Sequence, residues 1–280
     1  MKLGLKVALA AGVLGLVAAN AWFWLKAPAA SFATTPVQPD VQPVAVPPPA
    51  AAASPAMPIV QHPIDSVALA EPTAAPPDLP SAVRDLFGNK AVLALFQIDD
   101  LPRRVAATVD GLGRAHASSR LWPLNPAEGR FVVDAKGPSV TISPDNGLRY
   151  TPYVLLLETV DLRQVAAVYA RFYGQFQQAY EDLGYPGQYF NDRLIAVMDQ
   201  LLLTPDFTDP LRVHLPTANS PVQPQRPWVL YEFGDTELQA MTSGQRMLLR
   251  MGPVNERRIK AKLRELRRLL TTSAAPSAKK

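Results

Sequence analysis

Proline is distributed very unevenly along this chain of 280 residues, and that unevenness limits what the chain can fold into. Residues 27–80 hold 14 of the 29 prolines, many alanines and four acidic residues, but no lysine or arginine. Because the tract has no periodic apolar face, it cannot offset the entropy lost on ordering. We therefore predict a disordered Pro/Ala-rich linker, which at roughly 3.1 Å per residue could reach about 170 Å. It is either a spacer that holds a folded domain away from a membrane or a loose tether of no particular length.

An uncharged run of 19 residues, from Val7 to Leu25, precedes the linker. Its length is close to the roughly 20 residues with which a helix crosses the hydrocarbon core of a bilayer. Residues 22–24, Trp-Phe-Trp, stand at its far end, where aromatic rings favour the membrane–water interface. We predict that residues 1–26 are a membrane anchor, with residues 3–25 in the inner membrane.

The lysines around this run predict its orientation. Lys2 and Lys6 precede the run, and only Lys26 follows it before the linker. The positive-inside bias then leaves the amino terminus of this single-pass protein in the cytoplasm and the folded domain in the periplasm. The alternative is a cleaved secretory signal, indicated by the small-x-small pattern Ala19-Asn20-Ala21, which exports the remainder equally.

A helical spacing of apolar residues begins where proline thins out, at Ser81. About 190 residues follow, enough for one domain with its own core. We predict a globular domain over residues 81–271 and a disordered basic tail over residues 272–280.

The spacing of apolar residues predicts a mainly α domain with a small antiparallel β-sheet, an α+β arrangement. Phe131-Val132-Val133 and Val140-Thr141-Ile142 flank Lys136-Gly137-Pro138 and predict a hairpin. Two further strands are expected within residues 211–215 and 228–233. Helices are expected over residues 81–97, from Pro102 to Gly111 or Gly113, and over residues 161–184, 191–203, 235–251 and 253–270.

Two stretches of the folded part resemble a known family. They are LGYPGQYFNDRL at residues 183–194 and SGQRMLLRMGP at residues 243–253, the second followed by Asn255 and Lys260. Together with Arg149-Tyr150 and Tyr153, they are similar to a proteobacterial family known only as a domain of unknown function, DUF3014. The similarity extends over about residues 81–270. Typical members have one anchor, a proline-rich linker and this domain, so the resemblance implies boundaries but no activity.

The residue types present exclude several kinds of chemistry. With no cysteine, the chain has no disulfide, thiolate zinc site, iron–sulfur cluster or cysteine nucleophile. The three histidines, at positions 62, 116 and 214, have no metal ligand at a suitable spacing, so we predict no metal and no cofactor. The acidic pairs Asp99-Asp100 and Glu181-Asp182 suit a helix start and a solvent-facing helix end, and we predict no catalytic residue.

The densest polar and aromatic cluster is YFNDR at residues 189–193. In one interpretation its Asn or Asp only caps the helix that follows. In the other, its arginine joins an earlier Arg-Tyr pair to bind an anionic or glycan ligand, because the guanidinium fork suits carboxylates such as those of peptidoglycan peptides. An internal Arg–Asp pair would look the same in the sequence. The candidate residues are Arg149, Tyr150, Asn191, Asp192 and Arg193.

Positive charge is concentrated at the carboxy-terminal end. Residues 246–280 carry 11 basic and 2 acidic residues, whereas residues 81–245 carry 14 basic and 18 acidic ones. On the last expected helix, Ile259, Leu263, Leu266 and Leu270 form an apolar stripe and basic residues fill the other faces. Either this is a solvated face docked on the acidic body, or it binds an anionic envelope polymer, a lipid surface or an acidic protein partner. We predict no nucleic-acid partner for an exported domain, and the binding candidates are Arg257, Lys260, Arg264 and Arg268.

These observations favour a non-enzymatic, membrane-anchored periplasmic domain that binds an envelope component or a protein partner. The alternative is an enzyme that acts on the cell wall or on glycans through carboxylates that the sequence does not identify. Two carboxylates at glycosidase separation in one cleft would favour the enzyme. A flat apolar or basic patch would favour binding. The sequence makes no prediction about the oligomeric state.

Overall fold

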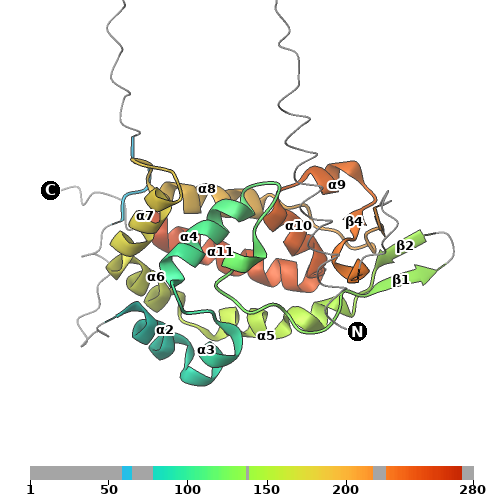
Figure 1. The fold of residues 1–280 in the computed structure, drawn as a ribbon, viewed down its shortest axis with the longest axis horizontal. Helices are drawn as coiled ribbons and strands as arrows, with labels where there is room; N and C mark the ends of the chain where they lie inside the picture. The colour runs from blue at the N-terminus through green and yellow to red at the C-terminus, as the bar shows by residue number, and fades with distance from the viewer. Residues whose placement is uncertain (1–58, 65–77, 137–138, 217–224, 273–280) are drawn as a thin grey trace, which may run out of the picture. The chain divides into compact units, whose positions relative to one another are not determined.

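The computed structural model describes residues 59–64, 78–136, 139–216 and 225–272 (Figure 1). These residues fall within one compact unit, Pro55–Lys280. The predicted membrane anchor, most of the predicted linker and residues 273–280 of the predicted tail lie outside the described residues. Within the described part, no helix has the length and apolar character needed to span a membrane.

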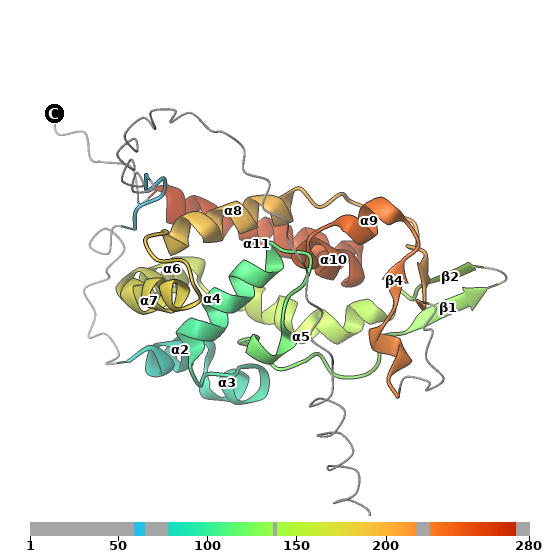
Figure 2. The ribbon, with the colours of Figure 1, turned by 45° about the horizontal axis from the view of Figure 1, so that its top comes forward.

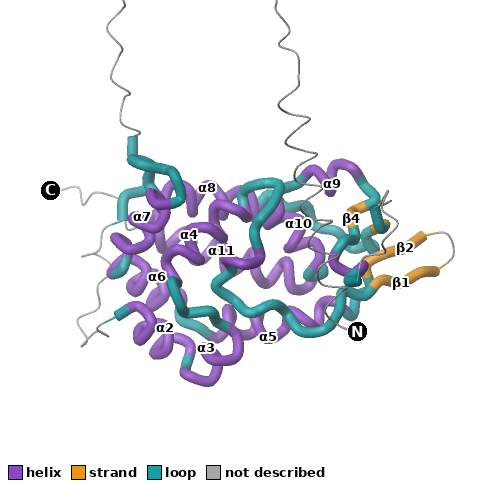
Figure 3. The backbone as a smooth tube through the Cα atoms, viewed as in Figure 1, coloured by secondary structure: helices purple, strands orange, loops and turns teal. Residues whose placement is uncertain are grey.

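Helices make up most of the described structure, and the expected mainly α architecture with small antiparallel sheets is confirmed (Figure 3). The helices are α2 (Leu79–Phe87), α3 (Asn89–Leu95), α4 (Leu101–Leu112), α5 (Asn146–Thr159), α6 (Leu162–Arg171), α7 (Tyr173–Asp182), α8 (Phe190–Leu202), α9 (Thr236–Ala240), α10 (Ser243–Arg250) and α11 (Pro253–Thr272), with 3₁₀ turns η1 (Ser119–Leu121) and η2 (Pro227–Val229). The strands are β1 (Val133–Lys136), β2 (Ser139–Ile142), β3 (Val213–His214) and β4 (Glu232–Phe233).

Three of the expected helices are each divided in two. The expected helix over residues 81–97 becomes α2 and α3, because Gly88 lies between them with a φ of 80°, a backbone conformation that suits glycine. The expected helix over residues 161–184 becomes α6 and α7, interrupted at Phe172. The expected helix over residues 235–251 becomes α9 and α10, because Thr242 starts α10 with its own capping box.

The sequence did not reveal helix α5. Its apolar residues do not share one face: Val154 is buried, whereas Leu148 and Leu155 are exposed. Pro152 lies inside the helix, where a proline ordinarily argues against helix formation. The pattern therefore lacked the single apolar stripe by which the other helices were identified.

The expected hairpin is confirmed as β1 and β2, which pair antiparallel with Val133 opposite Ile142. The second pair, β3 and β4, sets Val213 opposite Phe233, and both strands are shorter than expected. For β4, the 3₁₀ turn η2 takes up the start of the expected segment. A bridge between Thr141 and Arg212 links the two sheets.

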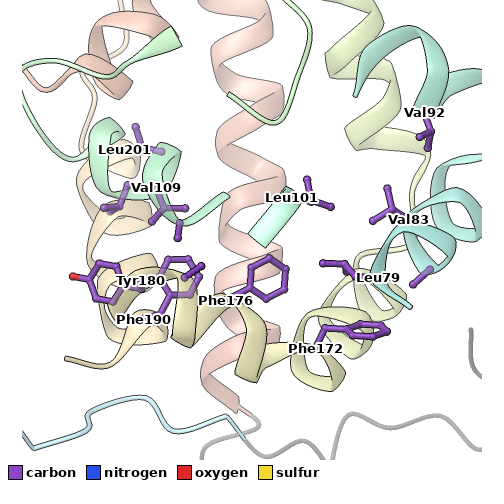
Figure 4. Close-up of a cluster of buried hydrophobic side chains, with 14 of the residues drawn as sticks. Leu79, Val83, Val92, Leu101, Val109, Phe172, Phe176, Tyr180, Phe190 and Leu201 are labelled. Carbon is purple, nitrogen blue, oxygen red and sulfur yellow. The ribbon is translucent and has the colours of Figure 1, made fainter. Parts of the chain in front are cut away.

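Aromatic side chains of α7 and α8 form the centre of the largest buried cluster (Figure 4). Phe176 and Phe190 stack with ring centroids 6.3 Å apart, and Tyr180 lies 5.5 Å from Phe190. Within the expected helix over residues 161–184, the aromatic side chains Phe172, Phe176 and Tyr180 are therefore core rather than a ligand platform. Leu79 and Val83 of α2 complete the cluster from the amino-terminal side.

Helix α11 runs among the other helices and contacts α5, α6, α8 and α10 (Figures 1 and 2). The expected apolar stripe of this helix faces them: Leu270 is buried, and Ile259, Leu263 and Leu266 pack against buried clusters. The last helix is thus part of the core.

Helix α10 lies close to both α4 and α8 at Gly244. A Cβ atom added there would lie 2.6 Å from a methyl group of Leu201 and 3.0 Å from the carbonyl oxygen of Leu112. The position therefore has no room for a side chain.

Replacing Gly244 by alanine is expected to lower the free energy of unfolding by about 1–3 kcal/mol, because the added methyl group overpacks this contact. The matched control is Gly174→Ala in α7, where a Cβ meets nothing within 4 Å. The control should be neutral or stabilising, since alanine favours a helix over glycine. Urea unfolding of both variants measures the difference, and equal stability of the two would contradict the close contact.

Candidate functional site

Four arginines and four aromatic residues line a pocket of about 630 Å³. No carboxylate is among the described residues that line it. Such a surface is positively charged and partly apolar, which suits an anionic ligand with an aromatic, aliphatic or ring-shaped body. We call it the arginine pocket; its charged and aromatic lining residues are Arg130, Phe131, Arg149, Tyr150, Arg226, Trp228, Tyr231 and Arg250.

Segments far apart in the sequence build the arginine pocket. Arg149 and Tyr150 stand near the start of α5, and Arg250 ends α10. Trp228 belongs to η2, and Arg130 precedes β1. The pocket therefore depends on how α5, α10 and the loops around the two small sheets pack together.

Arg149 fixes one wall of the pocket. Its Nε donates to the carbonyl oxygen of Glu128 at 2.9 Å, and its terminal nitrogen approaches the carbonyl oxygens of Gly129 and Ala127 at 3.3 and 3.4 Å. Its guanidinium carbon lies 5.6 Å from the centre of the Tyr150 ring. This arginine thus holds the loop before β1 in place while carrying positive charge at the pocket.

Two other arginines are exposed. The guanidinium of Arg130 stacks over Trp228 with its central carbon 4.3 Å from the ring centre. Within the described residues, neither Arg130 nor Arg226 has a side-chain hydrogen bond or an ion pair. Their N–H groups are therefore available to a ligand.

Arg250 carries a largely buried positive charge. Its terminal nitrogen donates to the carbonyl oxygen of Tyr231 at 2.7 Å, and the guanidinium lies 5.3 Å from the centre of the Phe233 ring. Burial, together with the nearby charge of Arg246, lowers the pKa of Arg250, although arginine stays protonated at neutral pH. No carboxylate among the described residues forms an ion pair with it. The nearby charge of Glu232 opposes the lowering of the Arg250 pKa without forming an ion pair, so an anion in the pocket would be attracted by a positive charge that is only partly compensated.

The structure separates Arg193 from Arg149 and Tyr150. Arg193, on α8, pairs with the Asp110 carboxylate at 3.1 Å and donates to the carbonyl oxygen of Asp110 at 3.0 Å. Arg114 shares the same carboxylate at 2.9 Å. Arg193 is thus the internal Arg–Asp pair that the sequence left open, and it joins α4 to α8.

Asn191 and Asp192 do not cap helix α8, whose N-cap is Tyr189. Instead the Asp192 carboxylate accepts from the backbone N–H groups of Gln61 and His62, at 2.9 and 2.7 Å. The Asn191 side chain donates to the carbonyl oxygen of His62 at 2.8 Å. These residues bind part of the expected linker, which at residues 59–64 is docked on the domain rather than free.

The expected basic face of α11 is narrower than the sequence indicated. Arg257, Arg264 and Arg268 are exposed, but Lys260 is only 3% exposed. Lys260 faces inward because it lies next to the apolar stripe and one turn after Glu256, whose carboxylate it meets at 2.7 Å. Lys260 is therefore a structural residue and not part of a binding face.

Sequence reasoning did not identify Arg130, Arg226 and Arg250 as pocket residues. No local spacing connects them with Arg149, since they are brought together only by the packing of α5, α10 and the loops. Arg250 lies inside the stretch SGQRMLLRMGP, and the resemblance of that stretch to the family was the one feature of the sequence that pointed to this residue.

Other residues of that stretch hold the fold together. The Ser243 hydroxyl donates to the carbonyl oxygen of Gly111 at 2.8 Å, and the Gln245 side chain completes the capping box with Thr242. Asn255 donates to the carbonyl oxygen of Gly147 at 2.8 Å and so ties α11 to α5. Among the described residues, no group of three or more histidines and acidic residues is arranged to hold a metal ion.

One comparison with known proteins gives a match. The model of a family described as "Protein of unknown function (DUF3014)" matches residues 101–267. The arginine pocket and residues Asn191 and Asp192 lie within the matched range, whereas residues 59–64 lie outside it. Neither the curated proteins nor the solved structures include a match to this chain.

Proposed function

The chain belongs to DUF3014, a family of proteins of unknown function, and from this premise we propose that it is a non-enzymatic binding module that takes an anionic ligand in its arginine pocket. The observation that carries the proposal is the gathering of four guanidinium groups around one pocket with no carboxylate among its described lining residues. Proteins ordinarily pair such charges, and an anion that supplies the missing acceptors binds through charge-assisted hydrogen bonds.

The chemistry of the pocket narrows the ligand to a carboxylate-bearing molecule with an apolar or ring-shaped body. Planar guanidinium groups fit carboxylates in a two-pronged geometry, and the Trp228 and Tyr231 rings offer apolar contact. Peptide stems of the cell wall carry such carboxylates. Their use as ligands accords with the periplasmic location that the 19-residue uncharged run and its flanking lysines favour.

Replacing Arg130 and Arg226 together by glutamine is expected to weaken ligand binding about tenfold or more, because each guanidinium contributes charge-assisted hydrogen bonds. Both side chains are exposed and lack described polar partners, so the thermal melt should change little, the stacking of Arg130 over Trp228 being the described contact that is lost. The probe is a soluble muropeptide with a free peptide stem, and the measurement is titration calorimetry on the full-length protein at fixed salt.

The matched control is the double variant Arg103→Gln/Arg163→Gln, which removes the same charge from exposed positions on α4 and α6. It should bind the muropeptide as the wild type does. Equal binding by the pocket variant and the control variant would assign the affinity to overall charge and overturn the proposal. Absence of binding by the wild type would exclude this ligand class.

The exposed arginines of α11 favour a second interaction, with an anionic lipid surface. Arg257, Arg264 and Arg268 share one helix face, because spacings of seven and eleven residues return to the same side. Sedimentation with phosphatidylglycerol vesicles at low and high salt tests this surface separately, using Arg257→Gln/Arg264→Gln/Arg268→Gln. The muropeptide titration should be unaffected by these three changes.

A further inference from the structure

A short segment, Ile59–Ile64, bends at Gln61 and His62 and lies against the start of helix α8 (Figure 1). In addition to the contacts of Asn191 and Asp192, the backbone N–H of Ile64 donates to the Tyr189 hydroxyl at 2.8 Å. Pro63, which lies between His62 and Ile64, has no backbone N–H and therefore needs no acceptor. We call Tyr189, Asn191 and Asp192 the α8 clamp, because their side chains hold the backbone at Gln61, His62 and Ile64.

The α8 clamp is held in position by the domain beneath it. Asn191 is fully buried, its side-chain oxygen accepts from the Tyr169 hydroxyl at 3.2 Å, and its backbone N–H donates to the Tyr173 hydroxyl at 3.2 Å. Tyr173 in turn donates to Gln177 at 2.8 Å. Burial raises the pKa of both tyrosines, so both hydroxyls stay protonated. The orientation of the Asn191 amide is therefore fixed before any peptide binds.

The contacts define what the α8 clamp recognises. Two acceptors (the Asp192 carboxylate and the Tyr189 hydroxyl) and one donor (the Asn191 amide) are directed at backbone groups. The clamp therefore recognises a main chain bent at Gln61 and His62 rather than particular side chains. Selectivity comes from one apolar position: Ile64 packs against the cluster that contains Ile195, Met198 and Leu270. A proline before that position is compatible because no contact uses its missing N–H.

The bound segment makes few contacts of other kinds. Ile59 and Val60 are exposed, as are Gln61 and Pro63, and the described segment forms no ion pair with the domain. Elements held by a few hydrogen bonds and two half-buried residues, here His62 and Ile64, open at low free-energy cost. The clamp belongs to the family-matched range, whereas the segment that fills it does not.

We propose that the α8 clamp is a binding site for a bent peptide segment with a proline followed by an aliphatic residue, and that residues 61–64 fill it in cis as a releasable latch. The site is separate from the arginine pocket, with which it shares no residue. Because the latch is part of the same chain, its effective concentration is on the order of millimolar, so a free peptide competes poorly until the latch is removed.

The first test removes the latch and supplies the peptide in trans. In the full-length protein, residues 61–64 are replaced by Gly-Ser-Gly-Ser, and binding of a fluorescent peptide with the sequence of residues 57–66 is measured by anisotropy. This variant should bind at least about tenfold more tightly than the wild type, in which the latch competes. A peptide with Ile64→Asp should not bind, because a charge replaces the apolar anchor.

Adding Asp192→Asn to the latch-replaced protein should weaken peptide binding about tenfold, since the acceptor for two backbone N–H groups loses its charge. The matched control adds Asp182→Asn, an exposed aspartate at the end of α7 that contacts only Gln178 in the described structure. Peptide binding that is absent in the latch-replaced protein, or equal in the two aspartate variants, would overturn the proposal. Thermal melts verify that every variant is folded.

The second test follows the latch in the otherwise unchanged full-length protein. Amide hydrogen exchange at Gln61, His62 and Ile64 should be slowed in the wild type and accelerated at least tenfold by Asp192→Asn, with no change for Asp182→Asn. Equal exchange in all three proteins would show that the latch is not held by the clamp. Muropeptide titration of the same proteins keeps this result separate from the function proposed for the arginine pocket.

Discussion

Replacing Lys260 by methionine is expected to lower the free energy of unfolding by about 3–5 kcal/mol, because it leaves a buried carboxylate without its partner. Glu256 is 2% exposed and its carboxylate lies 2.7 Å from the Lys260 ammonium. Lys260 also donates to the carbonyl oxygen of Thr204 and, at 2.8 Å, to Asp206. Urea unfolding of residues 55–280, the compact unit, measures the change.

The double variant Glu256→Gln/Lys260→Met should recover much of this loss, since it removes both buried charges. The matched control is Lys262→Met on the same helix, whose ion pair with Glu265 is half exposed and should contribute less than about 1 kcal/mol. If Lys260→Met and Lys262→Met have equal effects, Lys260 faces solvent and the sequence interpretation of a basic surface residue is restored.

The same lysine predicts a loss of stability in alkali. Burial opposes the charge of Lys260, but its hydrogen bonds to Asp206 and Glu256 outweigh this, so its pKa is raised above the ordinary value of 10.5. Because the pKa of Lys260 is higher in the folded state, the charged lysine contributes fully to the free energy of unfolding at a pH below 10.5. This contribution is lost as the pH rises through the folded-state pKa. The melting temperature of the wild type should therefore fall more steeply at high pH than that of the double variant.

Replacing Leu79 by alanine is expected to lower the free energy of unfolding by about 2–5 kcal/mol, because it leaves a cavity in the aromatic cluster. Leu79 is 3% exposed and packs with Val83 and the core at the first position of α2 (Figure 4). The preceding residue, Asp78, accepts a hydrogen bond from the backbone N–H of Ser81 and so caps the helix. Hydrogen bonding from Ser81 lowers the pKa of Asp78.

The matched control is Leu93→Ala on the neighbouring helix α3, where the leucine is 83% exposed. Thermal and urea unfolding of both variants should show a large loss for Leu79→Ala and a change within about 0.5 kcal/mol for Leu93→Ala. Equal effects would place Leu79 outside the core. The expected result also means that a domain beginning at Ser81, as the sequence predicted, lacks a core residue.

The sequence predicted those parts of the fold that depend on local periodicity. The apolar stripe on α11 and the helical character of residues 161–184 were identified because their apolar residues recur at spacings of three and four. The interruptions at Gly88 and Phe172 were missed because apolar residues continue in register on both sides of each break. The burial of Lys260 was missed because it depends on ion pairs with Glu256 and with Asp206. Asp206 lies in a loop outside the helix, so the residue spacing along α11 does not reveal it.

The candidate sites were predictable only where their residues are neighbours in the sequence. Arg149 and Tyr150 were found as a pair, and Asn191 and Asp192 stood out within YFNDR. Arg226 and Arg250 reach the pocket only through tertiary packing. The role of the α8 clamp was also hidden, because its occupant lies about 130 residues earlier in a tract whose composition indicates disorder.

Docking of residues 61–64 means that the maximum distance between the domain and its predicted anchor has two values, one with the latch closed and one with the latch open. With the latch closed, 32 residues (27–58) separate the predicted anchor from the docked segment, and at about 3.1 Å per residue they extend to at most about 100 Å. With the latch open, the connection runs to α2 at Leu79, and the limit becomes about 160 Å. When a peptide displaces the latch, the maximum distance between the predicted anchor and the domain that carries the arginine pocket would thereby increase by about 60 Å.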